Sequence, residues 1–525
     1  MKETEYYALA HACDSFLLQP DVNPARLANP FLHVVSEHPV HMAQYKALFQ
    51  DLDIRTSDGI RTSFTLKEDI AAYRIGHKIR KGYNSLWAMI PYKNNNPVKI
   101  LAGLKPVDVV IVSWLVNSGH LKEEDDFYFG PLQSILAERG LTSLLILGNQ
   151  SGHPSRDMSD DAHRDGPCAR YLLPDIMTIQ KELETFWKCF QARKQLNKEM
   201  TVSSNSFRTM VGSHAAHMKL RYIASNLRMY FFLSDICRQA QQSIFIALYE
   251  GHAWERLAFK SARQTHKPSL CVGYQHTTMR RNAYAMRRSL YPNSDYDPDL
   301  ILCLGEITCE ELSSSSGLSS VPTTVYGSHR CPSDEKVVTG PNSKQAVLVL
   351  PEGLEEECVV LFEFGLECAR RLPDVPFIFR THPVLPYEKI KTRLNNVNPW
   401  PSNVEISRER NIERDYGRSR CLLYRGSSTA LYAVLAGLKP FYVDRPGEMD
   451  IDPLFALKDW REHVGSAEEL VEAYKKDIAQ DIRYRLNGWE KGKEFCRKYV
   501  KPIQADAIDE MLKITQRISR VSRAN

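Results

Sequence analysis

The sequence lacks long apolar runs and paired cysteines. No stretch approaches the roughly 20 apolar residues that a helix needs to cross a bilayer. The chain opens with Met1-Lys2-Glu3-Thr4-Glu5 and only a short apolar stretch follows, so no secretory signal peptide is predicted. The 12 cysteines stand singly, without a CxxC pair. Scattered cysteines of this kind are typical of reduced thiols, and we expect a cytoplasmic protein.

Several widespread catalytic motifs are missing as well. There is no GxxxxGK[ST] loop, no HExxH, no GxSxG and no GxGxxG after a predicted strand. These absences argue against P-loop kinases and ATPases, HExxH metalloenzymes, serine hydrolases and NAD enzymes. Asp295-Tyr296-Asp297 has the form of a metal-holding DxD, but it precedes a predicted strand where such a motif should follow one. We therefore expect no metal and no cofactor.

The composition is that of an ordinary globular protein. The 525 residues are 43% hydrophobic, 10% aromatic and 25% charged, which excludes a disordered chain and provides for a large core. The length predicts two to four domains. A net charge of +5 is small for a chain of this length, and it does not indicate nucleic acid as a partner.

Buried strands alternate with helical stretches in two separate series. Short β-branched runs without polar alternation are typical of parallel strands that are covered on both faces. A polar stretch with two prolines, 331–345, separates the series and reads as a linker. The fold class predicted is α/β, with two doubly wound Rossmann-like domains followed by C-terminal helices. The predicted units are 1–330, the linker 331–345, 346–480 and a helical segment 481–525.

In such folds ligands bind at the carboxyl ends of the parallel strands. In the first series, strand 243–248 is followed by Glu250 and His252, side chains that can move protons. The alternative is that they only cap the next helix. Strand 269–273 is followed by Tyr274, Gln275 and His276, which we assign to the acceptor side of the site.

The second series has three polar strand exits. Strand 377–380 ends in Arg380, Thr381, His382 and Pro383, and the proline should keep His382 extended over the sheet edge. Such an imidazole can bind a phosphate or a base, or it can simply pack. Strand 421–424 leads into Gly426, Ser427, Ser428 and Thr429 and then a helix. These hydroxyls fit a phosphate site or an ordinary N-cap. Strand 346–350 leads into Glu352 and Gly353. This turn could approach a ribose or a base of a nucleotide, or it could be a plain tight turn.

The last residues, 511–525, contain Lys513, Arg517, Arg520 and Arg523 and no acid. A basic helix of this kind fits the surface of an anionic membrane, and a solvated helix end is the alternative. On the first interpretation the cytoplasmic protein would sit peripherally at the inner face of a membrane.

Taken together, these motifs resemble a known family. The two-domain plan looks like a GT-B glycosyltransferase. The pair Arg380-Thr381-His382-Pro383 and Gly426-Ser427-Ser428-Thr429 resembles the HP and SS motifs of bacterial transferases that use CMP-activated sugars, such as sialyl- and Kdo transferases. The same pair occurs in CDP-glycerol glycerophosphotransferases. The stretches 127–132 and 249–256 resemble proteins of surface-polysaccharide (O-antigen or capsule) biosynthesis.

The resemblance implies an inverting, metal-independent transfer of a sugar, such as a CMP-activated nonulosonic acid or Kdo, to a glycan or lipid-linked glycan. Glu250, together with His252, would take the proton of the acceptor hydroxyl. His382, Ser427 and Ser428 would hold the nucleotide. Glu352 and His252 remain alternatives as the base. Three other functions stay open: a CDP-alditol phosphotransferase, a UDP-sugar enzyme of the same fold, and a non-catalytic scaffold in polysaccharide assembly.

Overall fold

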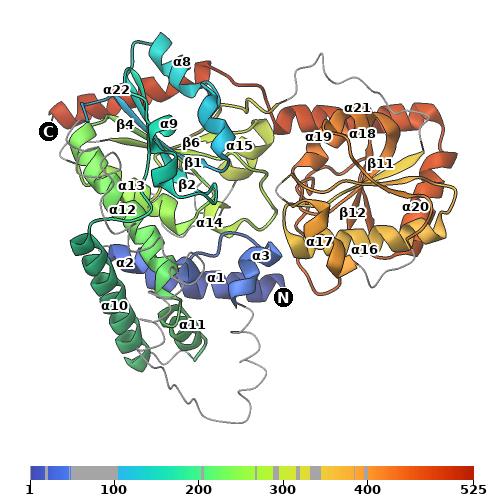
Figure 1. Cartoon of the computed structure of the whole chain (residues 1–525), viewed down its shortest axis with the longest axis horizontal. Coiled ribbons are helices and arrows are strands. Elements are labelled where there is room, and N and C mark those ends of the chain that lie inside the picture. The colour runs from blue at the N-terminus through green and yellow to red at the C-terminus, as the bar shows by residue number, and fades with distance from the viewer. Residues whose placement is uncertain are drawn as a thin grey trace.

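The computed structural model describes most of the chain. It covers residues 2–17, 22–45, 48, 104–202, 206–265, 269–287, 295–314, 320–331, 345–383, 385–394 and 400–524. Two parallel sheets lie side by side, each covered by helices (Figure 1). The Rossmann-like fold predicted from the alternating pattern is thereby confirmed for both domains.

The first sheet has seven strands in the order β3-β2-β1-β4-β5-β6-β7, and all neighbours are parallel. Its central strands are buried almost throughout, as a sheet covered on both faces requires. The strands are β1 (Val109–Leu115), β2 (Ser143–Asn149), β3 (Cys168–Leu172), β4 (Ile244–Leu248), β5 (Leu270–Tyr274), β6 (Leu300–Cys303) and β7 (Thr323–Val325).

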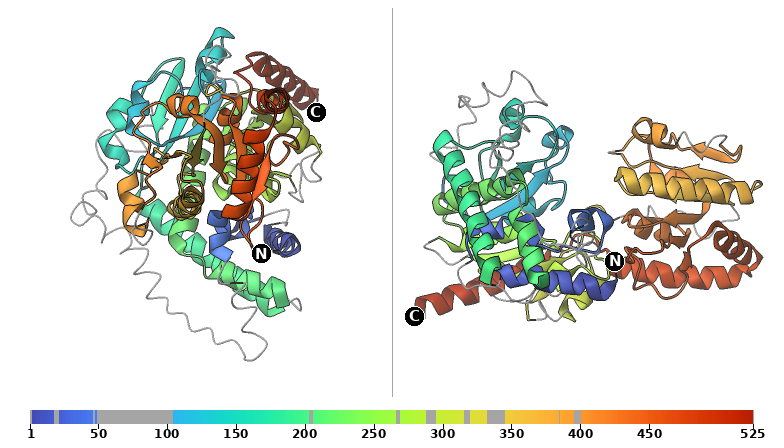
Figure 2. Two further views of the ribbon diagram at one scale, coloured as in Figure 1. Left: turned by 90° about the vertical axis from the view of Figure 1, so that its right-hand side faces the viewer. Right: turned by 90° about the horizontal axis from the view of Figure 1, so that it is seen from below.

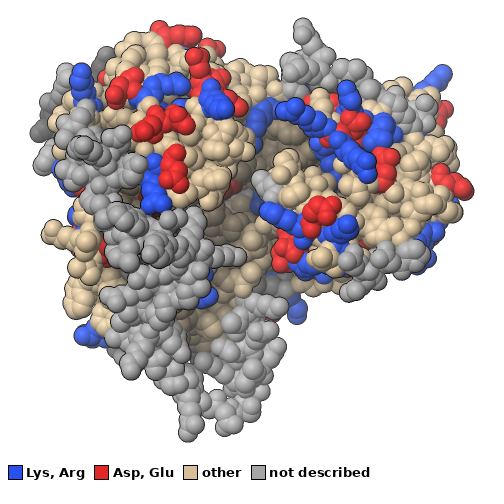
Figure 3. Space-filling model, viewed as in Figure 1, with Lys and Arg blue, Asp and Glu red and all other residues tan. Residues whose placement is uncertain are grey.

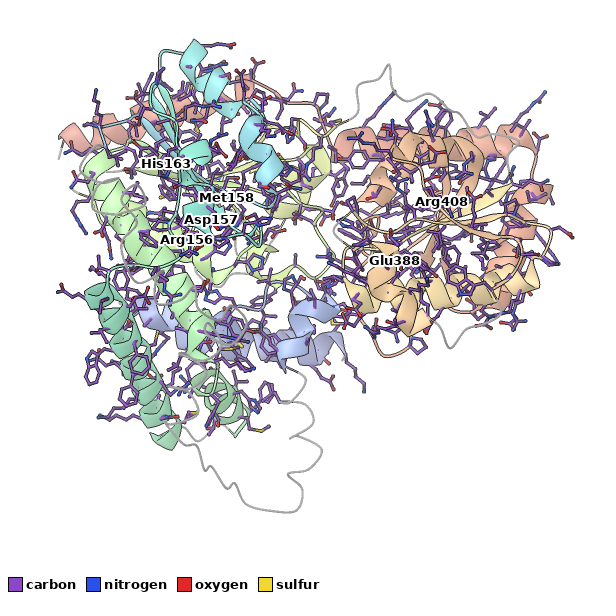
Figure 4. The ribbon with its side chains drawn as sticks, in the orientation of Figure 1. Arg156, Asp157, Met158, His163, Glu388 and Arg408 are labelled. Carbon is purple, nitrogen blue, oxygen red and sulfur yellow. The ribbon has the colours of Figure 1, made fainter. Side chains whose placement is uncertain are left out.

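Helices of this domain pack on both faces of the sheet. They are η3 (Ser118–Lys122), α8 (Leu132–Glu138), η4 (Ser155–Asp157), α9 (Ser159–Ala162), α10 (Ile179–Val202), α11 (Ser206–Ala216), α12 (Leu220–Ala240), α13 (Ala253–Arg263), α14 (Tyr284–Arg287) and α15 (Glu306–Ser313). Between β2 and β3, Figure 4 labels Arg156, Asp157, Met158 and His163. Met158 is buried in the core and the other three are polar.

The N-terminal segment, residues 2–45, packs against this domain as a separate layer (Figure 1). It is tied to the loop before α14: Tyr6 donates its hydroxyl to the carbonyl of Asn282 (2.6 Å) and Tyr284 donates to Asp14 (2.8 Å). Its elements are α1 (Glu3–Leu17), α2 (Pro24–Leu27), η1 (Pro30–Leu32), α3 (Pro39–Met42) and η2 (Ala43–Tyr45).

The second sheet has six parallel strands in the order β10-β9-β8-β11-β12-β13. The strands are β8 (Ala346–Leu350), β9 (Phe377–Phe379), β10 (Val404–Ile406), β11 (Ser419–Tyr424), β12 (Lys439–Val443) and β13 (Glu462–Val464). The helices are α16 (Glu355–Arg371), α17 (Tyr387–Leu394), α18 (Ile412–Arg418), α19 (Thr429–Leu435) and α20 (Ala467–Ala479). Figure 4 labels Glu388, on α17, and Arg408, after β10.

Two C-terminal helices join the domains. α21 (Ile482–Tyr499) lies on the second domain, where its fully buried Arg485 and Arg420 of β11 both bind Asp477 of α20. α22 (Asp506–Ala524) returns to the first domain, as Figures 1 and 2 show. There Arg139 binds Asp509 at 2.6 Å. Two Rossmann-like domains, followed by a last helix that returns to the first of them, agree with the two-domain plan predicted from the sequence.

Several elements differ from the sequence-based expectation. Helix α1 and strands β3 and β13 were not predicted, because β13 has only three residues, β3 carries Arg170 within its run and the N-terminal residues show little periodicity. Residues 332–344 of the predicted linker lie outside the described part of the chain, so the domain boundaries stay predictions. No helix in the described ranges is both long and apolar enough to span a membrane.

Candidate functional site

In both sheets the strand order reverses at the centre. The first sheet reverses between β1 and β4, and the second between β8 and β11. In open α/β sheets, ligands bind in the crevice outside the carboxyl ends of strands at this switch point. Glu250 follows β4, Glu352 follows β8, and Gly426 and Ser427 follow β11. Three of the predicted sites therefore lie at the switch points.

The turn from β4 into α13 is held by one carboxylate. Oε2 of Glu255 accepts hydrogen bonds from the backbone amides of Glu250 (2.8 Å), Gly251 (2.7 Å) and His252 (3.0 Å). Gly251 has φ +86, and a Cβ there would collide with Ala285. Burial raises the pKa of Glu255 to about 7, against the opposing charge of His252. This turn fixes where Glu250 and His252 stand.

Glu250 and His252 form an ion pair, with Oε2 and Nε2 3.3 Å apart. Their side chains keep 28% and 30% of their surface exposed, so a ligand can reach them. Burial opposes the charge on Glu250. Hydrogen bonds from His252 and Thr277 and the charges of two histidines nevertheless hold its pKa well below its usual range. Burial would lower the pKa of His252, but Glu250 and Glu255 outweigh it and raise this pKa to about 9. At neutral pH, Glu250 is therefore the anion of the pair and His252 is the cation.

The loop after β5 supplies the other side of Glu250. The Thr277 hydroxyl donates to Oε1 of Glu250. His276 lies beside them, edge-on to the Tyr128 ring at 4.7 Å, and burial lowers its pKa to about 4. Of the three residues assigned to the acceptor side, only His276 keeps measurable exposure, at 9%. Tyr274 and Gln275 are fully buried, and the Tyr274 hydroxyl donates to the carbonyl of Gly327.

Two histidines of the N-terminal segment lie next to the pair of Glu250 and His252. The His41 ring lies 5.6 Å from that of His252 and 6.1 Å from that of His38, measured between ring centroids. His38 in turn binds Glu352 of the second domain, with Nε2 3.0 Å from Oε2. A line of three imidazoles thus connects Glu250 to Glu352. The sequence analysis did not find His38 or His41, although their close spacing was a signal.

Glu352 is the main contact between the two switch points. Besides His38, Arg280 of the first domain approaches its Oε2 to 3.7 Å. Burial would raise the pKa of Glu352, but His38, Arg280 and Arg425 hold it below its usual range. A Cβ on Gly426 would meet this carboxylate, so a side chain there would displace Glu352. Gly353 follows in the same turn.

The serine cluster stands at the start of α19. Ser427 is buried and Ser428 is exposed. Ser428 is the N-cap residue, but its hydroxyl makes no capping hydrogen bond. The plain capping interpretation therefore does not account for Ser428. Thr429 begins the helix and is half-buried.

The predicted HP segment follows β9, on the other side of β8 from the serines. β9 and β11 are separated by β8 and are not neighbours, so Glu352 stands between the two motifs. His382 is half-buried, and its pKa is lowered by burial against the charge of Glu352. Pro383 is exposed. Arg380 turns away: its guanidinium binds Asp415 at 2.6 Å and the carbonyl of Glu409 at 2.9 Å.

Metal-binding geometry occurs once among the described residues, at Glu250, His252 and Glu255, whose ligand atoms lie within 4.8 Å of one another. These atoms already serve the ion pair and the turn. In the DxD-like segment, Asp295 binds Lys260, and Asp297 is buried 4.0 Å from Arg256. Both aspartates therefore serve packing of α13. Figure 3 shows a hollow between the two lobes, with Lys and Arg side chains along the second lobe's edge.

No family model matches the sequence, and no curated protein is significantly similar to it. Several solved structures share the general arrangement. The glycotransferase of kitacinnamycin is 11% identical, covers 78% of this chain and 99% of its own, and has a TM-score of 0.42. An α,α-trehalose-phosphate synthase (UDP-forming) from Burkholderia vietnamiensis is 11% identical, covers 78% and 98%, and has a TM-score of 0.47. A UDP-GlcNAc 2-epimerase from Neisseria meningitidis, bound to UDP-GlcNAc, is 12% identical, covers 77% and 99%, and has a TM-score of 0.41. Similarity at this level says nothing about chemistry.

The turn after β4 can be tested with two glycines. Gly251 and Gly140 both have positive φ (+86 and +74), but only Gly251 has no room for a Cβ. Left-handed backbone costs a non-glycine residue about 1–3 kcal/mol. We expect Gly251→Ala to lower the melting temperature clearly more than Gly140→Ala does. Equal losses would show that the contact with Ala285 relaxes freely and that the turn is not rigidly fixed.

Proposed function

We propose that this chain is an inverting, metal-independent glycosyltransferase. The observation that carries the proposal is that an ionised, reachable carboxylate, Glu250, stands at the switch point of one sheet. Glu352 and Ser427 stand at that of the other, and His382 follows the neighbouring strand β9. His38 and Arg280 connect the two edges. Proton acceptance and nucleotide binding would then take place on opposite walls of one crevice.

The donor nucleotide is assigned to the second domain. The Ser427 and Ser428 hydroxyls and the His382 ring can donate hydrogen bonds to its phosphates. Preorganised donors that face developing charge stabilise a leaving phosphate without a metal. A CMP-linked sugar is the donor that the HP and SS motifs favour. A UDP-sugar is equally consistent with this geometry, and a CDP-alditol remains possible for the same site.

Transfer would proceed by direct displacement. Glu250 accepts the proton of an acceptor hydroxyl, and the oxygen forms its bond to the anomeric carbon from the face opposite the phosphate. The bond from that carbon to the phosphate oxygen breaks, and its electron pair leaves with the nucleotide. His252, protonated at neutral pH, keeps Glu250 ionised and oriented rather than acting as the base. The acceptor would be a glycan or a lipid-linked glycan of surface-polysaccharide synthesis.

A peripheral membrane contact through 511–525 belongs to the same proposal. α22 includes this stretch, but the side chains from 517 onward lie outside the described part of the chain. Binding to vesicles with and without anionic lipid, compared between the full chain and a Lys513→Glu variant, addresses the contact.

The donor assignment is tested by nucleotide binding. A thermal-shift panel of CMP, CDP, UDP and GDP should identify one preferred base, and calorimetry gives its dissociation constant. A hydrogen bond to a charged group is worth about 1.5–3 kcal/mol. His382→Ala should therefore weaken the preferred nucleotide about tenfold or more. His463→Ala, which removes an imidazole paired with Asp444 at the far edge of the same sheet, should not. A chain that binds no nucleotide is better described as a scaffold.

Glu250→Gln tests the base. The change keeps the size of the side chain and removes the oxygen that accepts the proton, so transfer should fall by about 10²–10⁴-fold. Nucleotide affinity should stay at the wild-type value. The parallel variant Glu352→Gln should affect nucleotide binding instead. If Glu250→Gln retains more than about a tenth of the rate while Glu352→Gln retains none, the base belongs to the second domain.

The pH dependence separates Glu250 from His252. The pKa of His252 is raised above its unfolded value, so the ion pair is fully present below about pH 6.5 and is lost as the pH rises through about 9. With Glu250 as base, kcat/KM should fall across pH 9. Ionisation of Glu255 adds a rise near pH 7. A profile that climbs through pH 9 would instead assign the base to His252, and the His252→Gln variant should lack this limb.

A further inference from the structure

A cavity of about 170 Å³ opens directly beside the catalytic pair. One wall is His252 with Ala253, at the start of α13, and the others come from the N-terminal segment. A water molecule needs only about 10–15 Å³ on this measure, so the cavity is large enough for a ligand of several heavy atoms. None of the residues proposed above for the donor lines it.

The polar lining consists of three imidazoles and an amide, from His33, His41, His252 and Gln44. Pro30 and Val35 add an apolar surface, and Val40, 49% exposed, stands at the rim. Three of the four polar groups belong to the segment 30–44. That segment precedes β1 and is no part of either sheet. The cavity is therefore specific to this chain's N-terminal layer rather than to the Rossmann-like core.

The histidine at the buried end of the cavity has an unused acceptor. His33 is 4% exposed, and its Nε2 lies 2.7 Å from the carbonyl of Leu27. Because a carbonyl can only accept, Nε2 must carry the proton and Nδ1 must be an acceptor. Within the described residues, no donor reaches Nδ1. A buried acceptor without a partner is costly, and this one is closed to solvent, so it lies beside the cavity rather than on its accessible surface.

The charge in the cavity points to a neutral ligand. Burial lowers the pKa of His41 to about 3 and that of His33 well below its usual value, so both are uncharged at neutral pH. The charged groups that influence the pKa of His41 are His252, Arg280, His38 and Glu250. His252 and Glu250 form an ion pair, so their charges offset each other. Arg280 and His38 are engaged with Glu352. Neutral imidazoles and an amide both donate and accept, which suits hydroxyl groups.

We propose that this cavity is the acceptor subsite, and that it binds an uncharged sugar ring and presents one of its hydroxyls to Glu250. The inference rests on the proposed function and adds the class of acceptor and the segment that selects it. The hydroxyl proton passes to the Glu250 carboxylate, while the same oxygen bonds to the anomeric carbon and the nucleotide phosphate departs with the electron pair of the broken bond. Residues 30–44 would then determine which acceptor is used.

The test measures binding of methyl glycosides by saturation-transfer NMR. The probes are methyl glucoside, methyl galactoside and methyl N-acetylglucosaminide, with methyl glucuronide as a charged counterpart, each with and without the preferred nucleotide. His41→Phe keeps the ring and removes its nitrogens, and Val40→Trp fills the rim. His153→Phe makes the same chemical change on an exposed loop away from the cavity. The melting temperature of each variant confirms that it is folded.

We expect at least one neutral glycoside to bind the wild type and His153→Phe, and to bind at least tenfold more weakly to His41→Phe and Val40→Trp. Nucleotide affinity should be equal in all four proteins. Equal glycoside binding in all of them, binding of the glucuronide alone, or no binding even with nucleotide present overturns the subsite. Glycoside binding without any nucleotide binding leaves the subsite in place and overturns the transferase proposal.

Discussion

The site depends on one carboxylate that satisfies three backbone amides. Where a strand passes abruptly into a helix, the amides of the turn have no intrahelical partner and must be satisfied otherwise. Glu255 does this for residues 250–252, and Gly251 provides the left-handed backbone that brings the three amides together. Only with this turn closed do Glu250 and His252 point to the same side. The backbone geometry of the turn thus fixes the positions of two ionisable side chains, Glu250 and His252.

Segments outside the two sheets cover the switch points and bring them into contact. A Rossmann-like sheet leaves its carboxyl edge open, and here the N-terminal segment, the loop after β5 and the stretch between α21 and α22 lie at the edges. Glu352 is held by His38 and Arg280, which belong to two different parts of the first domain. Because a half-buried carboxylate requires compensation for its lost hydration, these two contacts favour the closed approach of the domains.

The sequence allowed the fold to be predicted because buried parallel strands leave a strong local pattern. The runs 107–112 and 243–248 could be predicted as strands from their own residues, without knowledge of the strands they pair with. The rule that ligands bind after strands located Glu250, Glu352 and Ser427 in the same way. Other members of the site were out of reach. Nothing local distinguishes Glu255 from a first-turn helix acid, and Arg380 looked like a phosphate ligand until its bond to Asp415 was seen. His38 and His41 approach the site only through tertiary packing of a segment with little periodicity.

The two carboxylates at the switch points are not equivalent, and the difference supports one division of labour. Both oxygens of Glu352 lie within about 3.1 Å of Nε2 of His38, and Arg280 adds a guanidinium beside a side chain that is only 13% exposed. Glu250 has one imidazole and one hydroxyl as partners and twice the exposed fraction. A carboxylate oxygen that takes a proton from a substrate must be open to that substrate. The side chains that bind the carboxylate must also be free to move with it. Glu250 meets both conditions, whereas taking a proton on Glu352 would break the contact that joins the domains.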